Sequence, residues 1–281
     1  MRYHPPVLFD AFLHARSLSP RDLSDLRFFG VAGALVPADD DVGPGGAAAV
    51  RRGWRETVAA ARRLRRAGLA GYAALGIPPR RIPARGLEAL LAELPDALGQ
   101  PEVAALGAVG LEQGTPLEER VLLRQLELAR ELRLPVLVAV PAAGRERLTR
   151  RTLAILMDAG LAPGQALLAG AGERTVRAVL ACGHLAGLSL SRGDGADGVD
   201  EAIRTVSALG PEGLVLGSDA GLSGGDLLAL PRAADRLARA GLSVAVVRRV
   251  CAANAVAFLR VDPGALSARE PRRRSGRRAS R

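Results

Sequence analysis

Short apolar runs alternate with amphipathic stretches along this sequence, and this alternation constrains the fold more than any other feature. Eight β-rich runs occur at residues 7–9, 31–36, 71–75, 104–109, 136–140, 166–168, 185–190 and 214–216. The stretches between them with apolar residues at helical spacing include residues 47–67, 86–98, 117–132, 145–159, 173–181, 199–209 and 226–240. Strands that alternate strictly with helices form parallel sheets, and eight such units predict a closed barrel. We therefore predict an α/β fold, a single parallel eight-stranded (β/α)8 or TIM barrel.

The main alternative to the barrel is an open, doubly wound sheet. Its first strand-to-helix turn usually carries a GxGxxG motif, which residues 10–18 do not resemble. The length of 281 residues, 48% of them hydrophobic, suits one barrel of about 250 residues. Glycines at 68, 160, 183, 210 and 241 follow helical stretches where a left-handed C-cap is expected. We predict a barrel over residues 1–266 followed by a tail at 267–281.

The positive charge of the chain is concentrated in that tail. All 39 basic residues are Arg, and the formal net charge is +10. Residues 267–281 hold seven Arg and one Glu, so the rest of the chain is only mildly basic. A run this poor in apolar residues cannot bury a core, and we expect a disordered basic tail. It would contact nucleic acid or anionic lipid nonspecifically, or remain solvated without a dedicated partner.

Membrane and redox signals are weak. The apolar run at 134–140 is far shorter than the roughly 20 residues of a membrane span, and the first residues carry no signal-peptide pattern. Cys182 and Cys251 lack CxxC spacing, which favours buried free thiols. We expect a cytoplasmic protein without a membrane span.

Working residues of a (β/α)8 barrel lie at the C-terminal ends of its strands. At these ends, over about residues 7–262, the sequence resembles the TatD family of metal-dependent hydrolases, which are amidohydrolase-type TIM barrels. The matching motifs are LFDAFLH, ALGAVGLE, QLELARELRLPVLVAVP, LLAGAGERTVRAVLACGHLAGLSLS, GLVLGSDAGLSGGDLLALP and ANAVAFL. The resemblance implies the same barrel and a site at its C-terminal mouth.

The resemblance also implies a metal site, because family members bind one or two divalent ions such as zinc, manganese or magnesium. Their ligands are the two His of DxHxH on strand 1, a Glu on strand 4, a His on each of strands 5 and 6, and an Asp on strand 8. The corresponding positions here are Phe12, His14, Ala108, Ala139, Gly170 and Asp219. Only His14 and Asp219 can coordinate a metal, whereas a catalytic site usually needs three or more protein ligands. The chain is thus predicted to be a degenerate member without a bound cofactor.

Two functional hypotheses follow. The first is a non-catalytic protein with a binding or scaffolding role, for an anionic small molecule or a protein partner. The alternative is a divergent hydrolase of phosphodiester or related bonds that uses residual His14 and Asp219, with Glu112 as a second acid or base or with one weakly held metal. These polar residues are also of the kind that simply hold a barrel mouth together.

Other polar residues admit both a functional and an ordinary interpretation. Arginines in the predicted C-terminal loops would suit an oxyanion, or would be solvated surface in a chain rich in Arg; they are Arg16, Arg80, Arg145 and Arg192, with Arg81 and Arg147 nearby. Ser218 lacks the GxSxG elbow of a nucleophile. The spacing of Asp194, Asp197 and Asp200 favours turns and helix capping over a calcium loop.

Overall fold

The computed structural model describes residues 7–38, 45–191, 198–222 and 225–266. The predicted disorder of residues 267–281 lies outside the described residues, as do Arg192, Asp194 and Asp197. Within the described part, no helix is long and apolar enough to cross a membrane.

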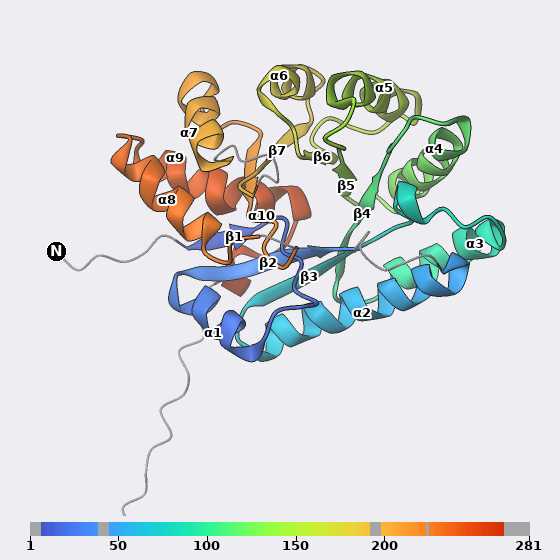
Figure 1. Cartoon of the computed structure of the whole chain (residues 1–281), viewed down its shortest axis with the longest axis horizontal. Coiled ribbons are helices and arrows are strands. Elements are labelled where there is room, and N and C mark those ends of the chain that lie inside the picture. The colour runs from blue at the N-terminus through green and yellow to red at the C-terminus, as the bar shows by residue number, and fades with distance from the viewer. Residues whose placement is uncertain (1–6, 39–44, 192–197, 223–224, 267–281) are drawn as a thin grey trace, which may run out of the picture.

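The structure confirms the parallel eight-stranded barrel (Figure 1). Its strands are β1 (Leu8–Asp10), β2 (Val31–Pro37), β3 (Ala70–Leu75), β4 (Val103–Gly110), β5 (Val136–Ala139), β6 (Ala166–Ala169), β7 (Leu185–Ser189) and β8 (Leu214–Gly217). Each strand pairs in parallel with the next along the chain. The strand order β1 to β8 therefore follows the sequence, as a singly wound barrel requires.

Helices surround the strands. They are α1 (Pro20–Phe28), α2 (Gly46–Arg66), α3 (Leu87–Leu98), α4 (Pro116–Glu131), α5 (Arg145–Asp158), α6 (Glu173–Ala181), α7 (Gly198–Leu209), α8 (Ala229–Arg239), α9 (Val244–Arg248) and α10 (Asn254–Leu259). Short turns of helix are η1 (Pro79–Arg81), η2 (Arg249–Ala253) and η3 (Pro263–Leu266). The five predicted glycine caps all have left-handed φ angles, between +70° and +87°.

Helix α1 has the weakest apolar signal of the ring. It buries only Leu23 and Leu26. Its start is specified instead by a capping box between Ser19 and Asp22 and by Pro20 in the first turn. Two buried residues give little periodicity, so this helix is identified by its cap and not by its pattern.

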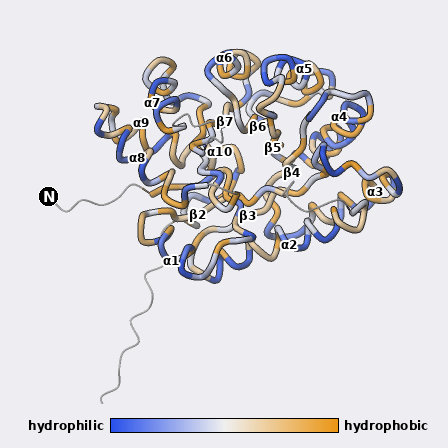
Figure 2. The backbone as a smooth tube through the Cα atoms, viewed as in Figure 1, coloured by the Kyte–Doolittle hydropathy of each residue, from blue (hydrophilic) through white to orange (hydrophobic). Residues whose placement is uncertain are grey.

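Two apolar clusters make up the core. The larger lies between the strands and the helices, and apolar residues line the strands and inward helix faces in Figure 2. The smaller fills the barrel interior with Phe9, Phe12, Leu35, Leu137 and Val215 and is continuous with residues of η2, α10 and η3. The C-terminal segment thus packs against the inside of the barrel, so the interior is an apolar core and not a channel.

The barrel closes between β1 and β8 through contacts beyond the strand ends. The backbone N–H of Asp219 donates to the carbonyl of Phe12 at 2.9 Å, and that of His14 donates to the carbonyl of Ala220 at 2.8 Å. The side chain of Asp10 joins the same two segments through Ser218. We call this junction the β1–β8 seam; it positions the polar residues at the mouth.

Candidate functional site at the barrel mouth

Of the six positions that the family resemblance assigns to metal ligands, five lie at or just beyond the C-terminal ends of strands, and the sixth lies near the end of one. Phe12 and His14 follow β1, Ala108 lies within β4, Ala139 ends β5, Gly170 follows β6 and Asp219 follows β8. Around Ala108 the register shifts, because Leu106 pairs with Val136 and Val109 with Val138, which makes a bulge. Ala139 on β5 pairs with Ala169 on β6. Gly170 is therefore one residue further along the chain than the residue opposite Ala139.

Phe12 occupies space that side chains of β7 and β8 would otherwise fill. Its ring is 1% exposed. A Cβ added at Gly217 would lie 2.0 Å from Cδ2 of the ring, and one added at Gly187 would lie 2.4 Å from its Cζ. The two glycines therefore form a notch into which the phenyl group packs. Glycine within a strand often marks such a close approach, and this is the sequence signal for the notch.

Asp10 is a buried carboxylate that sequence reasoning did not assign to the site. It accepts hydrogen bonds from the backbone N–H of Ser218 at 3.0 Å, from the backbone N–H of Phe12 at 3.2 Å and from the Ser218 hydroxyl. Burial raises its pKa from 3.8 to about 6, the charge of Asp219 adds to the rise, and the bonds from Ser218 and Phe12 oppose it. Its signal was its place in LFDAFLH, next to the positions of the family's ligands.

Ser218 has a structural environment. Its side chain is fully buried, its hydroxyl donates to Asp10, and the same oxygen accepts from the backbone N–H of Ala220 at 2.9 Å. A nucleophile needs an adjacent base and access to substrate. The ordinary interpretation of Ser218 is therefore the one that its contacts favour.

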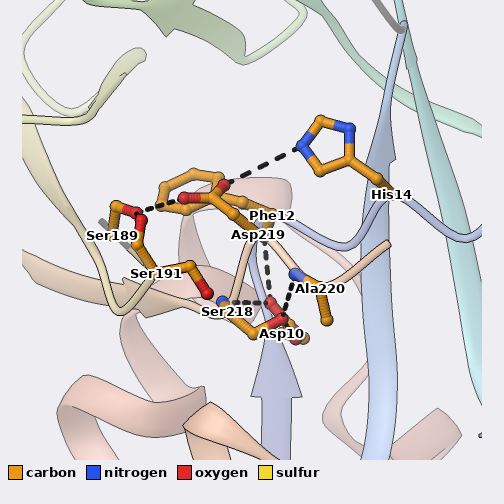
Figure 3. A network of polar contacts seen from close by, with 8 residues as sticks. All are labelled: Asp10, Phe12, His14, Ser189, Ser191, Ser218, Asp219 and Ala220. Carbon is orange, nitrogen blue, oxygen red and sulfur yellow. Dashed lines mark hydrogen bonds and ion pairs between the residues drawn. The ribbon is translucent and has the colours of Figure 1, made fainter. Parts of the chain in front are cut away.

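Asp219 is the centre of the polar network in Figure 3. Its Oδ1 lies 3.8 Å from Nε2 of His14, and its Oδ2 is hydrogen-bonded to the Ser189 hydroxyl. The hydroxyl oxygen of Ser189 also lies 2.8 Å from the carbonyl oxygen of Ser191. The side chains of His14 and Asp219 are 13% and 21% exposed, so solvent reaches both. Ser189 and Ser191 were not identified from the sequence, since serines at a strand end carry little signal.

The backbone at Asp219 is unusual, because its φ is +52°. Non-glycine residues rarely adopt this left-handed conformation, although Asp tolerates it better than most. The conformation directs the Asp219 N–H to Phe12 while its carboxylate meets His14 and Ser189. The strained residue is held by contacts on both sides of the seam.

Glu112, the proposed second acid or base, is bound to an arginine. Its Oε1 accepts from Arg80 at 2.6 Å on the loop after β4. That loop is held by Glu118, whose Oε2 accepts from the backbone N–H groups of Glu112, Gln113 and Gly114 at 2.9–3.0 Å. Burial acts to raise the pKa of Glu118, but these bonds outweigh it and the pKa is lowered.

The predicted arginines have partners of their own. Arg16 is paired with Glu56 and Arg80 with Glu112, while Arg145 begins α5. Asp200 is paired with Arg236 of α8, which agrees with a structural role. Since the charges of Arg16 and Arg80 are compensated by carboxylates, anion binding there stays a prediction.

The residues present at this mouth do not fit a catalytic divalent ion. Of the six assigned positions only His14 and Asp219 carry donor atoms, and the Phe12 ring fills the notch between β7 and β8. Across the described parts of the chain, no three His, Cys, Asp or Glu side chains are grouped so that they could hold a metal. Such a site usually has at least three protein ligands.

Comparisons with known proteins place this fold among metal-dependent hydrolases. No protein-family model matches the chain. An uncharacterised metal-dependent hydrolase from Methanocaldococcus jannaschii is 26% identical over 150 residues, or 53% of this chain. The match spans 59% of that relative's own length.

Solved structures extend the likeness over nearly the whole chain. A TatD-like protein from Archaeoglobus fulgidus is 29% identical with a TM-score of 0.75, covering 90% of this chain and 100% of that one. A phosphotriesterase homology protein from Escherichia coli, solved with phosphate in its active site, is 17% identical with a TM-score of 0.67. Its match covers 92% of this chain and 100% of that one. This chain is therefore a TIM-barrel protein related to the TatD-like metal-dependent hydrolases.

Proposed function

We propose that this chain is a TatD-like barrel that has lost metal-dependent hydrolysis and acts as a binding or scaffolding protein. The packing of Phe12 carries the proposal. Its buried phenyl ring stands where the resemblance assigns a histidine ligand, and Gly187 and Gly217 provide the space for the ring. Because Phe12 after β1 packs against glycines of β7 and β8, the phenyl group at this position is part of the core.

The chemistry of the remaining donors supports the same conclusion. A divalent ion supplies hydrolases of this type with a hydroxide at neutral pH, by lowering the pKa of bound water. Here the Asp219 carboxylate is bound to Ser189 and faces one imidazole, His14. One imidazole and one carboxylate would hold a divalent ion weakly. Two of the arginines that would bind a small anion, Arg16 and Arg80, are already paired with glutamates, which weakens the case for an anionic ligand at those two residues.

A divergent hydrolase is the second candidate, and the pair formed by His14 and Asp219 favours it. The carboxylate lies 3.8 Å from the imidazole, and both side chains are partly exposed at the mouth. In such an enzyme Asp219 would orient His14 and stabilise its protonated form, while His14 moves a proton to or from the substrate. The notch filled by Phe12 has no role in this alternative.

Metal analysis combined with phosphodiesterase and nuclease assays separates the two candidates. The purified protein is expected to hold well under one equivalent of zinc, manganese or iron and to turn over neither substrate with or without added metal. Stoichiometric metal, or metal-dependent turnover that is abolished by Asp219→Asn, would contradict the proposal. Metal-independent turnover lost in His14→Gln would support the divergent hydrolase.

A restored variant serves as the positive control. Phe12→His, Ala108→Glu and Ala139→His together should create measurable metal affinity if the assigned positions are right. Gly170 is left unchanged because its φ is +79° and an added Cβ would lie 3.0 Å from the carbonyl oxygen of Val140. Metal-induced stabilisation of this variant, but not of the unmodified protein, is the expected result.

A further inference from the structure

Helix α2 presents a row of arginines on its outermost face. The helix runs along the lower edge of the molecule in Figure 1, and its 21 residues include seven Arg and one Glu. Five exposed residues follow one another at spacings of three and four, which places them in one line along the helix: Arg52, Arg55, Ala59, Arg62 and Arg66. At about 1.5 Å of rise per residue, the line is roughly 21 Å long. We call its four arginines the α2 basic row.

Most of the α2 basic row has no carboxylate beside it. Arg62 lies 3.0 Å from Glu102. Within the parts of the chain that the structure describes, no salt bridge involves Arg52, Arg55 or Arg66. Like charges three or four residues apart destabilise a helix. The row therefore lowers the stability of α2 unless negative charge from outside the chain lies against it.

The neighbouring helix α3 carries the opposite charge. Its 12 residues include three carboxylates and no basic residue. All three of these side chains are exposed: Glu88, Glu93 and Asp96. Glu88 is 79% exposed and approaches Arg124 of α4 only to 3.9 Å, and no salt bridge of the described residues involves Asp96. Helix α3 thus presents negative charge beside the positive charge of α2.

Two contacts fix the heights of α2 and α3 relative to each other. A Cβ added at Gly86, just before α3, would lie 3.5 Å from the Cβ of Ala47 in the first turn of α2. Further along, Nε of Arg51 donates to Oε2 of Glu93 at 2.6 Å. Both helices follow a strand of the barrel, so they run in the same direction, away from the mouth. The first half of the α2 basic row therefore lies at the height of the α3 carboxylates.

We propose that two copies of this chain associate through α2 and α3, with the α2 basic row of each copy against the α3 carboxylates of the other. An isologous interface uses the same surface on both copies and so requires a self-complementary surface. A two-fold axis parallel to the two helices brings α2 of one copy opposite α3 of the other and keeps their heights. Both barrel mouths then open at the same end of the dimer. This association goes beyond the proposed binding function of a single chain.

Charge distinguishes a second copy from other partners. Helices packed side by side are about 8–10 Å apart, so a nucleic-acid duplex or an anionic membrane on the α2 basic row would also lie over α3. There the exposed carboxylates would repel it. An acidic helix of another protein would match the row but leave the α3 carboxylates without a partner. A second copy matches both helices, because it is acidic opposite α2 and basic opposite α3.

Sedimentation velocity over a concentration series tests the proposal with the full-length protein. The net charge of +10 opposes association at long range, but at about 0.15 M salt charges are screened beyond about 8 Å. The facing side chains act at shorter range, so a dimer is expected in that salt. At about 1 M salt the screening length falls to about 3 Å, and the dissociation constant should rise about tenfold or more.

Charge reversal on each helix tests which surfaces meet. Arg52→Glu with Arg55→Glu places carboxylates opposite the acidic α3 of the other copy, and Glu88→Arg with Asp96→Arg places arginines opposite its basic α2. Each double variant should raise the dissociation constant about tenfold or more, because like charges then face each other. An equimolar mixture of the two should form a heterodimer, since opposite charges face each other at both contacts.

A matched control reverses two exposed arginines on the other side of the barrel. Arg177→Glu on α6 with Arg204→Glu on α7 makes the same change in net charge and should leave the dimer unchanged. A protein that is monomeric at both salt concentrations overturns the proposal, as does a dimer that neither reversal weakens.

Two further outcomes also contradict the proposal. One is a mixture of the two reversal variants that stays monomeric, provided that both variants melt at the temperature of the unmodified protein. The other is a monomeric protein that binds a DNA duplex and loses this binding in the Arg52→Glu, Arg55→Glu variant, because the row would then serve a polyanion.

Discussion

The two halves of the barrel mouth have been built differently. Around β1, β7 and β8, polar side chains remain and are bonded to one another across the β1–β8 seam: Asp10, His14, Ser189, Ser218 and Asp219. Near the ends of β4, β5 and β6, the comparable positions Ala108, Ala139 and Gly170 carry no polar side chain and are partly exposed. The polar groups thus lie in the half of the mouth where side chains join the first strand to the last.

This difference separates two reasons for keeping a polar residue. At β4 to β6, neighbouring strands are joined by backbone pairing, with one bulge around Ala108, so side chains at their ends are not needed for closure. At the seam, closure depends on Asp10 and on contacts of residues beyond the strands. The polar residues at the seam therefore have a structural role in closure, which the small residues at the ends of β4 to β6 do not have. The predictions below test whether the seam half carries more of the stability.

The largest expected effect is that of Phe12→Ala. Removing a fully buried phenyl group that fits the notch at Gly187 and Gly217 should lower the free energy of unfolding by about 3–5 kcal/mol. Urea denaturation measures this. Phe28→Ala is the matched control, since its exposed ring should change stability by no more than about 0.5 kcal/mol. A Phe12→Ala protein as stable as the control would mean that the packing of Phe12 in the notch contributes little to the free energy of unfolding.

Asp10 should give the seam a pH dependence opposite to that of an ordinary carboxylate. Its pKa is about 6 in the folded protein and near 3.8 when unfolded, so folding favours the protonated form. This contribution to stability is fully present below about pH 4 and is lost as pH rises through 6, with a total change of about 3 kcal/mol. Urea denaturation from pH 4 to 8 should show the decline in the unmodified protein and its absence in Asp10→Asn. Equal slopes in the two proteins would show that Asp10 does not titrate in this window.

Glu118 provides the corresponding test in the β4 half. Its lowered pKa has the opposite sign: the stability from its bonds to three backbone N–H groups is present at neutral pH and is lost as pH falls through the folded pKa. Glu118→Gln should cost about 1–2 kcal/mol at pH 7. The neighbour Glu119, which is partly exposed and paired with Arg151, is the matched control, and Glu119→Gln should cost less than about 1 kcal/mol. A larger loss from Glu118→Gln than from Phe12→Ala would reverse the comparison between the halves.

The smallest effect is expected for Glu112. Its pair with Arg80 is exposed to solvent, and such pairs contribute about 0–1 kcal/mol. Glu112→Gln should therefore leave the melting temperature nearly unchanged and should not alter any hydrolytic activity. If hydrolysis is found and this variant abolishes it, Glu112 belongs to the chemistry, and the divergent hydrolase becomes the better proposal.

The sequence by itself determined the barrel fold and the end of the barrel at which the candidate site lies. The alternation of strands and helices indicates order and connectivity, because burial on both faces of a parallel strand leaves a continuous apolar run. Glycine caps mark helix ends because the left-handed backbone there favours glycine. The positions of the motifs relative to the apolar runs place Phe12, His14 and Asp219 after β1 and β8. All of these depend on interactions within a few residues of each other, which a linear pattern records.

Only the tertiary structure decided what those residues touch. Phe12 meets Gly187 and Gly217 across about two hundred residues of sequence, and Asp10 reaches Ser218 over the same separation. Helix α1 buries only two leucines. It is specified by its N-terminal cap and by packing against β2, and not by a periodic apolar pattern. The partners of Arg16, Arg80 and Glu112 are likewise set by loops that meet in space. Contacts between distant segments depend on barrel closure, and no local pattern encodes which side chains closure brings together.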